Sequence, residues 1–350
     1  MKKTCLKLIC ITLVVVFVCG ILSGCEAMHA KKYEKAQTLY SQGKYSEAAD
    51  IFSGIRDYKD SYQLAADCYF EAKDYESASG MYLYLSSKGN QKNIYRKAVC
   101  NYELGDYDNA SYTFEKIPEY EDASKYLVKI YLKKIANAEL NDIVKFGRYE
   151  QDNDDSNGKE AIEWNVVTKE GNRVLLISDK ILDYQPYSTG NELEGGATYS
   201  EETFVSWKDA HLRSWLNNDF YNIAFNEDEK GKLLNVLLTT ENKGGLPSCQ
   251  TNDNVFILSA EEFEEISDKA TIGTLNQLAT EYAKESRRYE DCWNSCYTRD
   301  QEPYNGLFGL SSVYSPGVID KHNTIYYMSK SSELGAIRPC IWIDISTIDD

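Results

Sequence analysis

The sequence predicts an α + (α+β) fold, in which a helical-hairpin repeat array is followed by an α+β domain. Residues 30–140 repeat with a period of 30 to 32 residues, which is typical of stacked helical hairpins. Near Asn141 the helical pattern gives way to alternating apolar and polar positions, which predict strands. A basic start and a long uncharged run precede both parts. We therefore expect four segments: 1–24, 25–32, 33–140 and 141–350.

The composition restricts the kinds of partner. The chain has 350 residues, a formal net charge of −17 and 43% hydrophobic residues, which is enough for two domains with cores. Nucleic acid binds basic surfaces by releasing counterions, so the acidic balance argues against a nucleic-acid partner. The same balance disfavours contact of the surface with anionic lipid, so attachment to a membrane would depend on acyl chains.

The first 25 residues have the composition of an export signal. Three lysines precede an uncharged run from Leu8 to Gly24, and small residues lie next to Cys25. Residues 22–25, Leu-Ser-Gly-Cys, resemble the lipobox of bacterial lipoproteins. The resemblance implies removal of the signal peptide 1–24, diacylglycerol and palmitate on Cys25, and a lipidated tether, 25–32, at the extracytoplasmic face of the cell membrane. A plain N-terminal membrane anchor is the alternative.

Three units of the repeat align on Tyr45, Tyr75 and Tyr107. Alanines lie nine residues before and three after each tyrosine: Ala36, Ala66, Ala98, Ala48, Ala78 and Ala110. Aromatic residues lie five before and seven after: Tyr40, Phe70, Tyr102, Phe52, Tyr82 and Phe114. Small residues on both helices let the backbones approach closely, and the aromatic residues fill the space beside them. Because no unit buries its own apolar face, we expect the units to stack.

The turns and the last helix complete the array. Asp74 and Asp106 are predicted to cap the second helices of their units, while Gly43 and Gly105 end the first. Residues 121–140 are expected to form a closing helix. The pattern resembles the tetratricopeptide family over about a third of the chain, although the repeats are slightly short and lack the proline after the second helix. The resemblance implies a peptide-binding groove and a protein partner; a spacer or assembly surface is the alternative.

The second part is expected to mix short strands with helices, as in an α+β domain. Strands are predicted at 144–149, 162–168, 173–178, 255–258 and 337–345. Helices are predicted at 206–220, 227–234, 260–266 and 280–286. A hairpin turn is predicted at Glu170-Gly171-Asn172.

This part resembles a family of bacterial extracellular domains with no established activity. The matching stretches are Phe146–Tyr149, Asp154–Trp164, Leu175–Ser178, Trp207, Leu212–Asn217, Ala224–Phe225, Phe256–Ser259 and Ile337–Ile343. The resemblance implies a layout similar to the C-type lectin-like and formylglycine-generating-enzyme fold. Residues 292–299 stand where the family usually has a Trp-Trp-Leu-Arg-Ser-Pro-Gly run, so we expect the role of that run to be altered here.

Residues 152–163 are a candidate calcium-binding loop. Asp152, Asp154, Ser156 and Glu163 fall at positions one, three, five and twelve of a helix–loop–helix calcium site. However, Asn157 takes the position that normally holds glycine, and strands flank the loop. A polar hairpin turn is the alternative, so we assign neither a metal nor another cofactor.

Six cysteines remain beyond Cys25. Cys68 and Cys100 occupy one register in successive repeats, about 9–10 Å apart, too far for a disulfide, so both are expected in the core. The other four, with one histidine, suit a zinc site: Cys249, Cys292, Cys296, Cys340 and His322. Disulfides or buried thiols are the alternatives outside the cell, and the sequence leaves the pairing open.

These patterns favour a membrane-anchored binding or adaptor protein whose partner is an envelope protein or a glycan. Tyrosines of the loop-rich end are candidates for sugar or peptide contact: Tyr297, Tyr304, Tyr314, Tyr326 and Tyr327. The sequence contains neither a Gly-x-Ser-x-Gly elbow nor a phosphate loop, so we assign no catalytic residue. One alternative is an assembly scaffold with an inert C-terminal domain. The other is an extracellular enzyme that uses Cys292, Cys296 or Cys340.

Overall fold

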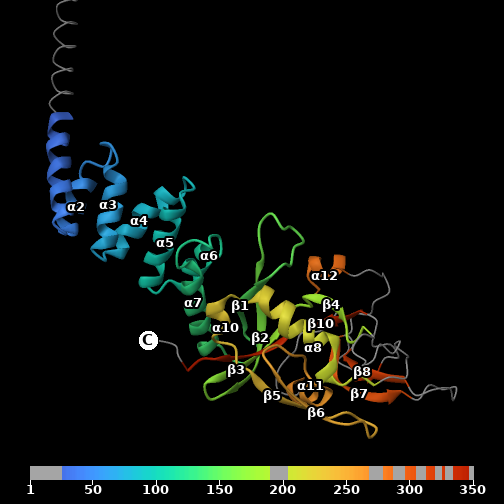
Figure 1. The fold of residues 1–350 in the computed structure, drawn as a ribbon. Coiled ribbons are helices and arrows are strands. Elements are labelled where there is room, and N and C mark those ends of the chain that lie inside the picture. Colours follow the sequence, from blue (N-terminus) through green and yellow to red (C-terminus); the bar gives the residue numbers. More distant parts are fainter. Residues whose placement is uncertain are drawn as a thin grey trace, which may run out of the picture. The chain divides into compact units, whose positions relative to one another are not determined.

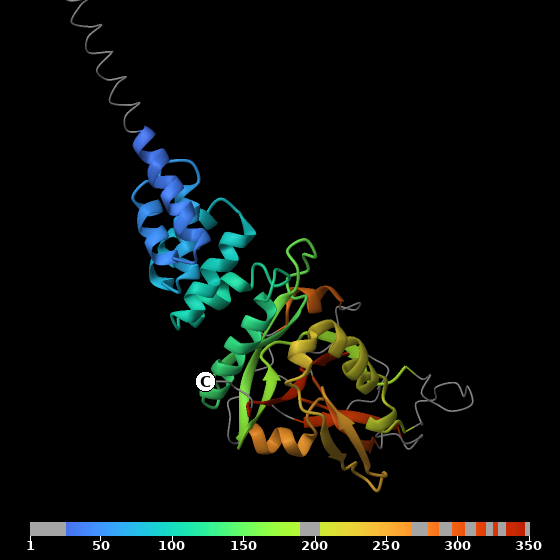
Figure 2. The ribbon, with the colours of Figure 1, turned by 60° about the vertical axis from the view of Figure 1, so that its left-hand side comes forward.

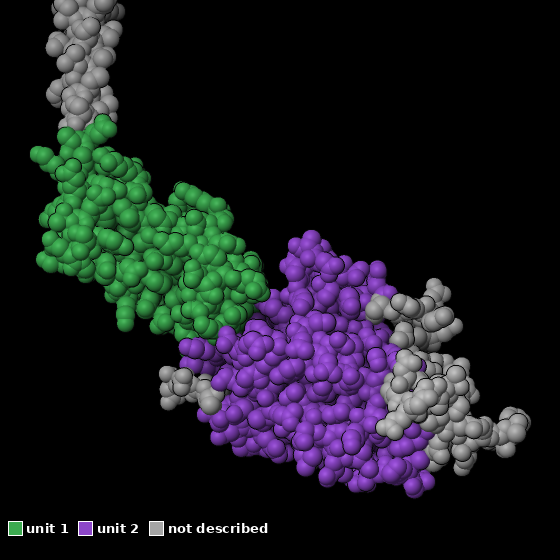
Figure 3. All heavy atoms as spheres, in the orientation of Figure 1, with its two compact units in different colours: residues 1–127 green, residues 128–350 purple. Residues whose placement is uncertain are grey.

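The computed structural model describes residues 26–189, 204–267, 279–286, 296–304, 313–319, 325–327 and 334–346. The chain divides into two compact units, residues 1–127 and 128–350, which Figure 3 colours separately. The division falls within helix α7, Ala123–Asn137, whereas the sequence pattern changes at residue 141.

The first unit is a row of helical hairpins (Figure 1). After a first helix at residues 26–41, the helices are α2 (Tyr45–Ser53), α3 (Ser61–Glu71), α4 (Tyr75–Ser86), α5 (Gln91–Glu103) and α6 (Tyr107–Phe114). The segment expected as a tether at 25–32 is therefore helical from residue 26. Its sequence lacks Pro and Gly, and the helix continues into Tyr33, which is buried against Phe52.

The alanine positions of the repeat form the core of the first unit, as predicted. All six predicted alanines are completely buried, and so are the aromatic residues of the second helices: Phe52, Tyr82 and Phe114. The aromatic residues of the first helices lie nearer the surface, and Tyr40 is 40% exposed. Each packs edge-on against the tyrosine across its turn; in the first repeat the Tyr40 and Tyr45 ring centroids lie 5.4 Å apart. Phe70 still packs against the buried alanines of its unit, as predicted, whereas Tyr40 does not fill the space beside its alanines.

The turns follow the predicted chemistry. Asp74 and Asp106 accept hydrogen bonds from backbone N–H groups at the starts of α4 and α6, each at 3.2 Å. Gly43 and Gly105 adopt φ of +73° and +78°, the left-handed conformation that ends a helix. Lys73 takes the equivalent place in the middle repeat at φ +60°, a conformation that a side chain makes less favourable.

The second unit contains two larger sheets and a ribbon. The first sheet has the order β1-β2-β3-β11 and is antiparallel: β1 (Ile143–Tyr149), β2 (Glu160–Glu170), β3 (Arg173–Ser178) and β11 (Cys340–Asp344). The second has the order β4-β10-β7-β8-β9: β4 (Asp183–Pro186), β10 (Leu334–Ile337), β7 (Cys296–Tyr304), β8 (Val313–Ile319) and β9 (Ile325–Tyr327). Strands β5 (Val236–Thr240) and β6 (Cys249–Asp253) form the antiparallel ribbon.

Helices accompany these strands. They are η1 (Trp207–Asp209), α8 (His211–Trp215), the π-helical η2 (Leu216–Phe220), α9 (Tyr221–Ala224), α10 (Glu227–Lys230), α11 (Ala260–Ser267) and α12 (Glu281–Ser286). Both ribbon views show the yellow helices beside the first sheet (Figure 1 and Figure 2). Phe225 stacks on the buried Trp164, whose Nε1 donates to Phe146 O at 2.7 Å. This aromatic contact joins the helices to the sheet.

Two predicted elements differ in the structure. The helix expected at 227–234 stops at Lys230, and Leu234 N then donates to Trp342 O at 2.9 Å, which draws the chain toward β11. The strand expected at 255–258 is buried but irregular, with a single bridge between Phe256 and Cys340. Both segments carry apolar runs whose final form depends on distant partners rather than on their own periodicity.

Candidate functional site

Asp67 in α3 is the centre of a polar network between the second and third repeats. Its Oδ1 accepts hydrogen bonds from Tyr82 Oη at 2.6 Å, Arg96 Nη1 at 3.0 Å and Gln63 Nε2 at 3.0 Å. Its Oδ2 lies 3.4 Å from Lys92 Nζ. The Asp67 side chain is only 13% exposed, and these donors offset the loss of water around its charge. The network therefore fixes α3 against α4 and α5.

Arg96 extends the network toward the surface. Its guanidinium lies 4.6 Å from the centroid of the Phe70 ring and 3.2 Å from Glu71 Oε1. Beside it, the amides of Gln63 and Asn93 exchange hydrogen bonds at 3.0 Å. The cation is thus matched by carboxylates of the preceding repeat. Lys92 and Arg96 are therefore paired with carboxylates and do not form an open basic cluster for an acidic partner.

Tyr82 distinguishes the second repeat from its neighbours. The equivalent positions hold Phe52 and Phe114, which are buried without a hydroxyl group. Burial raises the pKa of Tyr82, so its hydroxyl keeps the proton that it donates to Asp67. The repeat pattern predicted an aromatic residue here, but the carboxylate that accepts its hydrogen bond lies on the preceding helix.

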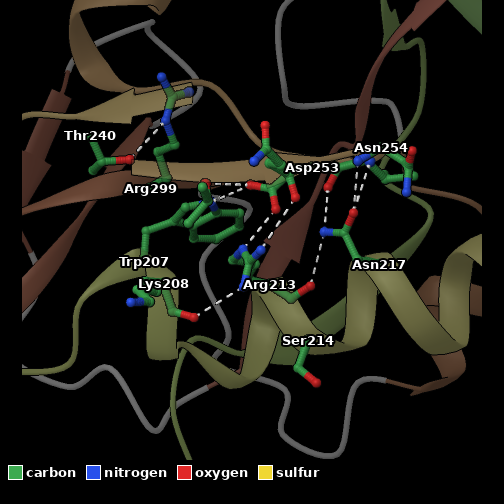
Figure 4. Close-up of polar contacts among 12 residues, drawn as sticks. Trp207, Lys208, Arg213, Ser214, Asn217, Thr240, Asp253, Asn254 and Arg299 are labelled. Carbon is green, nitrogen blue, oxygen red and sulfur yellow. Dashed lines mark hydrogen bonds and ion pairs between the residues drawn. The ribbon is translucent and has the colours of Figure 1, made fainter. Parts of the chain in front are cut away.

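Asp253 at the end of β6 is the centre of a second polar cluster, in the second unit (Figure 4). Its carboxylate is fully buried and accepts hydrogen bonds from Trp207 Nε1 at 2.9 Å, Thr251 Oγ1 at 2.8 Å and Arg213 Nε at 2.7 Å. Arg213 also donates to two backbone carbonyls. The cluster ties η1 and α8 to the β5–β6 ribbon, and its donors offset the desolvation of the buried charge.

Asn217 holds the chain that follows β6 (Figure 4). Its Oδ1 accepts from Asn254 N at 2.8 Å and Val255 N at 3.3 Å, and its Nδ2 donates to Val255 O at 2.9 Å. Asn217 lies in the π-helical turn η2, which interrupts the regular helix. One amide thereby satisfies three backbone groups of a buried, irregular segment, which explains why that segment needs no strand partner there.

Arg299 in β7 is the third polar anchor. Its side chain is 1% exposed and pairs with Glu262 through Nη1 and Nη2, the two terminal guanidinium nitrogens. It also donates to Ile257 O at 3.0 Å and to Thr240 Oγ1 at 3.2 Å. The charge is therefore paired, and β7 is joined to α11 and to the ribbon. As in the Asp253 cluster, the polar groups of this arrangement form their hydrogen bonds within the domain.

Two thiols of the second unit, Cys296 and Cys340, are not activated. Burial raises the pKa of Cys296 to about 12 and also raises the pKa of Cys340. The thiolate is the nucleophilic form, so both thiols are held in the unreactive form near neutral pH. Cys249 is half-buried, and no disulfide joins these three thiols to one another or to another described cysteine. Cys292 and His322, the other members of the predicted zinc set, lie outside the described residues.

Three carboxylates gather at the end of β1. Oxygen atoms of Glu150, Asp152 and Glu160 lie within 4.8 Å of one another. The same groups accept hydrogen bonds from loop backbone: Gln151 N donates to Glu160 Oε2 at 2.8 Å, and Asp154 N donates to Asp152 Oδ1 at 3.0 Å. These are the contacts of the polar turn that the sequence offered as the alternative to calcium.

The predicted calcium ligands do not come together as a set. Asp152 alone belongs to the carboxylate group above. Asp154 Oδ1 accepts from the backbone N–H and hydroxyl of Ser156, at 3.0 and 2.6 Å. Glu163 lies in β2, where its carboxylate is 3.6 Å from Lys180 Nζ. The strand places Glu163 elsewhere because β2 already begins at Glu160.

The remaining predicted residues are only partly placed. Tyr297 is buried against Tyr187, with ring centroids 6.0 Å apart, so it is not the exposed ring we expected. The structure does not describe the side chains of the other four tyrosines: Tyr304, Tyr314, Tyr326 and Tyr327. Cys25, the predicted lipidation site, also lies outside the described residues. Across the described ranges, no helix combines the length and apolar character needed to cross a membrane.

Comparisons with known proteins match both parts of the chain. Residues 171–345, half of the sequence, match the family described as "Domain of unknown function (DUF6273)". Residues 93–121 match the family described as "Tetratricopeptide repeat". Among solved structures, the first TPR of Spaghetti (RPAP3) bound to the HSP90 peptide SRMEEVD is 22% identical, with a TM-score of 0.26; the match covers 29% of this chain and 89% of that one. A search of curated proteins found no match.

Proposed function

The chain belongs to the family of the domain of unknown function DUF6273, and on that premise we propose that it is an anchored adaptor whose tetratricopeptide-like repeats bind a partner protein. The observation that supports this most is the network centred on Asp67. It locks α3, α4 and α5 into one rigid surface. A preformed surface loses little conformational entropy when a partner binds.

The anchor is the part of the proposal that rests on sequence. We propose that the signal is removed before Cys25, that acyl chains are attached to this residue, and that the mature chain is held at the extracytoplasmic face of the cell membrane. The support is the basic start, the apolar run and the Leu-Ser-Gly-Cys ending of residues 22–25. Two or more acyl chains would hold the protein firmly, whereas one would release it readily.

For the second unit we propose a binding role without catalysis. Its buried charges, Asp253 and Arg299, are engaged within the domain, and burial keeps Cys296 and Cys340 protonated. Resemblance to the C-type lectin-like layout supports an envelope glycan or protein as the ligand. The alternative is that this unit is an inert cap on a repeat scaffold. Glycan-array binding by the full chain distinguishes the two.

Site-specific photo-crosslinking in the native host tests the adaptor role. A photoreactive phenylalanine is placed at one of three exposed positions. These are Tyr40 in the first helix of the first repeat, Tyr112 in α6, the second helix of the third repeat, and Leu237 in the second unit. We expect a defined covalent adduct with one envelope protein from position 40 and not from position 112. Adducts that arise from Leu237 alone, or from none of the three positions, would contradict binding by the repeats.

A further inference from the structure

The first helix carries a basic stripe that the repeat packing does not use. Met28, Lys31, Lys32 and Lys35 follow the spacing i, i+3, i+4, i+7, which places them along one side of a helix. With Ala27 they line a single shallow surface hollow, and all are exposed. Tyr33 lies between these residues in the sequence and Ala36 directly follows them, and both are buried in the core. We call these four residues the basic stripe.

The charge of the basic stripe is not neutralised by the described part of the chain. The side chains of Lys31, Lys32 and Lys35 form no hydrogen bond, ion pair or cation–π contact within the described residues, whereas those of Lys92 and Lys125 are each paired with an aspartate. Glu34 flanks the stripe without pairing to its lysines. Three positive charges beside an exposed methionine therefore remain on the surface of a strongly acidic protein. Such a pattern fits an anionic partner that also offers apolar contact.

The position of the basic stripe identifies that partner. The helix is formed from residue 26 onward, directly after Cys25. At about 1.5 Å per residue, Lys35 lies on the order of 15 Å along the helix from Glu26, the residue that follows Cys25 in the sequence. If Cys25 is acylated, the stripe is held within that distance of the bilayer surface. At about 0.1 M salt, charges more than roughly 10 Å away are largely screened, so the acidity of the rest of the chain does not prevent a local contact.

We propose that the basic stripe binds anionic phospholipid headgroups and lays the first helix on the membrane surface. The proposal rests on the anchor proposed above and adds a second, electrostatic attachment to it. Lysine side chains near an anionic surface each strengthen binding about fivefold, so three should contribute on the order of 100-fold. Met28 would enter the boundary between headgroups and acyl chains, as apolar residues of interfacial helices do.

Vesicle binding by the complete mature chain tests the proposal. Residues 25–350 with Cys25→Ser, which removes the acylation site, are mixed with vesicles of phosphatidylglycerol and phosphatidylcholine, or of phosphatidylcholine alone. The stripe variant carries Lys31→Gln, Lys32→Gln and Lys35→Gln. The control variant makes the same charge change at three other exposed lysines whose side chains have no described partner: Lys44, Lys73 and Lys129. Circular dichroism confirms that each variant is folded.

We expect the unaltered chain to bind the anionic vesicles. The affinity of the stripe variant for these vesicles should be lower by on the order of 100-fold, and that of the control variant should change little. The attachment should weaken as salt is raised. A chain that binds anionic vesicles no better than neutral ones would overturn the inference, and so would an equal loss in the control variant. Neither result depends on acylation of Cys25, which is measured separately on the native protein.

Discussion

Asp253→Ala is expected to lower the free energy of unfolding of the second unit by about 3–5 kcal/mol. The substitution removes the only carboxylate that pairs with Arg213 among the described residues, and it leaves Trp207 Nε1 without its acceptor in a buried site. The loss follows from an uncompensated guanidinium and an unsatisfied indole N–H. Urea unfolding followed by tryptophan fluorescence measures it, since all five tryptophans of the chain lie in this unit.

Two further variants make this measurement specific. Asn252→Ala alters the exposed neighbour and should change the unfolding free energy by less than about 0.5 kcal/mol. Asp253→Asn keeps the shape and one acceptor, so its effect should fall between those of the two alanine variants. An Asp253→Ala chain as stable as the Asn252→Ala chain would show that the cluster in Figure 4 does not hold the ribbon.

Gly147→Ala is expected to destabilise the second unit by about 3 kcal/mol. Gly147 adopts φ of +70°, and an added Cβ would lie 2.6 Å from Phe225 Cε1 and 2.9 Å from the Ala224 carbonyl. The left-handed conformation costs about 1–2 kcal/mol for a residue with a side chain, and forcing extra volume into a packed site costs about 1–3 kcal/mol more. The same fluorescence-detected unfolding experiment reports the change.

Gly171→Ala separates the two causes. Gly171 also has a positive φ, +57°, but an added Cβ in this β2–β3 turn would meet nothing within 4 Å. This variant should therefore lose only about 1 kcal/mol, the cost of the backbone conformation. Equal losses at the two glycines would mean that the contact between β1 and Phe225 is looser than the packing of this aromatic cluster requires.

The repeat array is predictable from sequence because its determinants are local. Each hairpin brings together residues fewer than about 35 positions apart, and the same small and aromatic residues recur in each unit. Burial of Ala36, Ala66 and Ala98 follows directly from that register. The Asp74 and Asp106 caps depend only on the backbone three residues on. Tyr40 is exposed because a ring beside a turn meets the partner tyrosine before it reaches the core.

The second unit is predictable in class but not in its polar anchors. Trp207 and Arg213 lie in one stretch of sequence, yet their partner Asp253 is 40 or more residues away and ends a ribbon that the apolar pattern does not reveal. The sequence does not predict strands β5 and β6, because polar residues occupy most of β6 and the residues before β5 have a helical pattern. Arg299 and Glu262 likewise meet across 37 residues. Such pairs are fixed by topology, which single-sequence periodicity does not encode.

The proposed adaptor combines a rigid repeat surface with a membrane-facing first helix, so its function depends on where the chain is attached. Mass spectrometry of the protein isolated from its native membrane measures this attachment directly, through the N-terminal proteolytic peptide. We predict a mature N-terminus at Cys25 that carries diacylglycerol on sulfur, with residues 1–24 absent. A peptide that retains Met1, or an unmodified thiol at Cys25, would contradict the anchored adaptor.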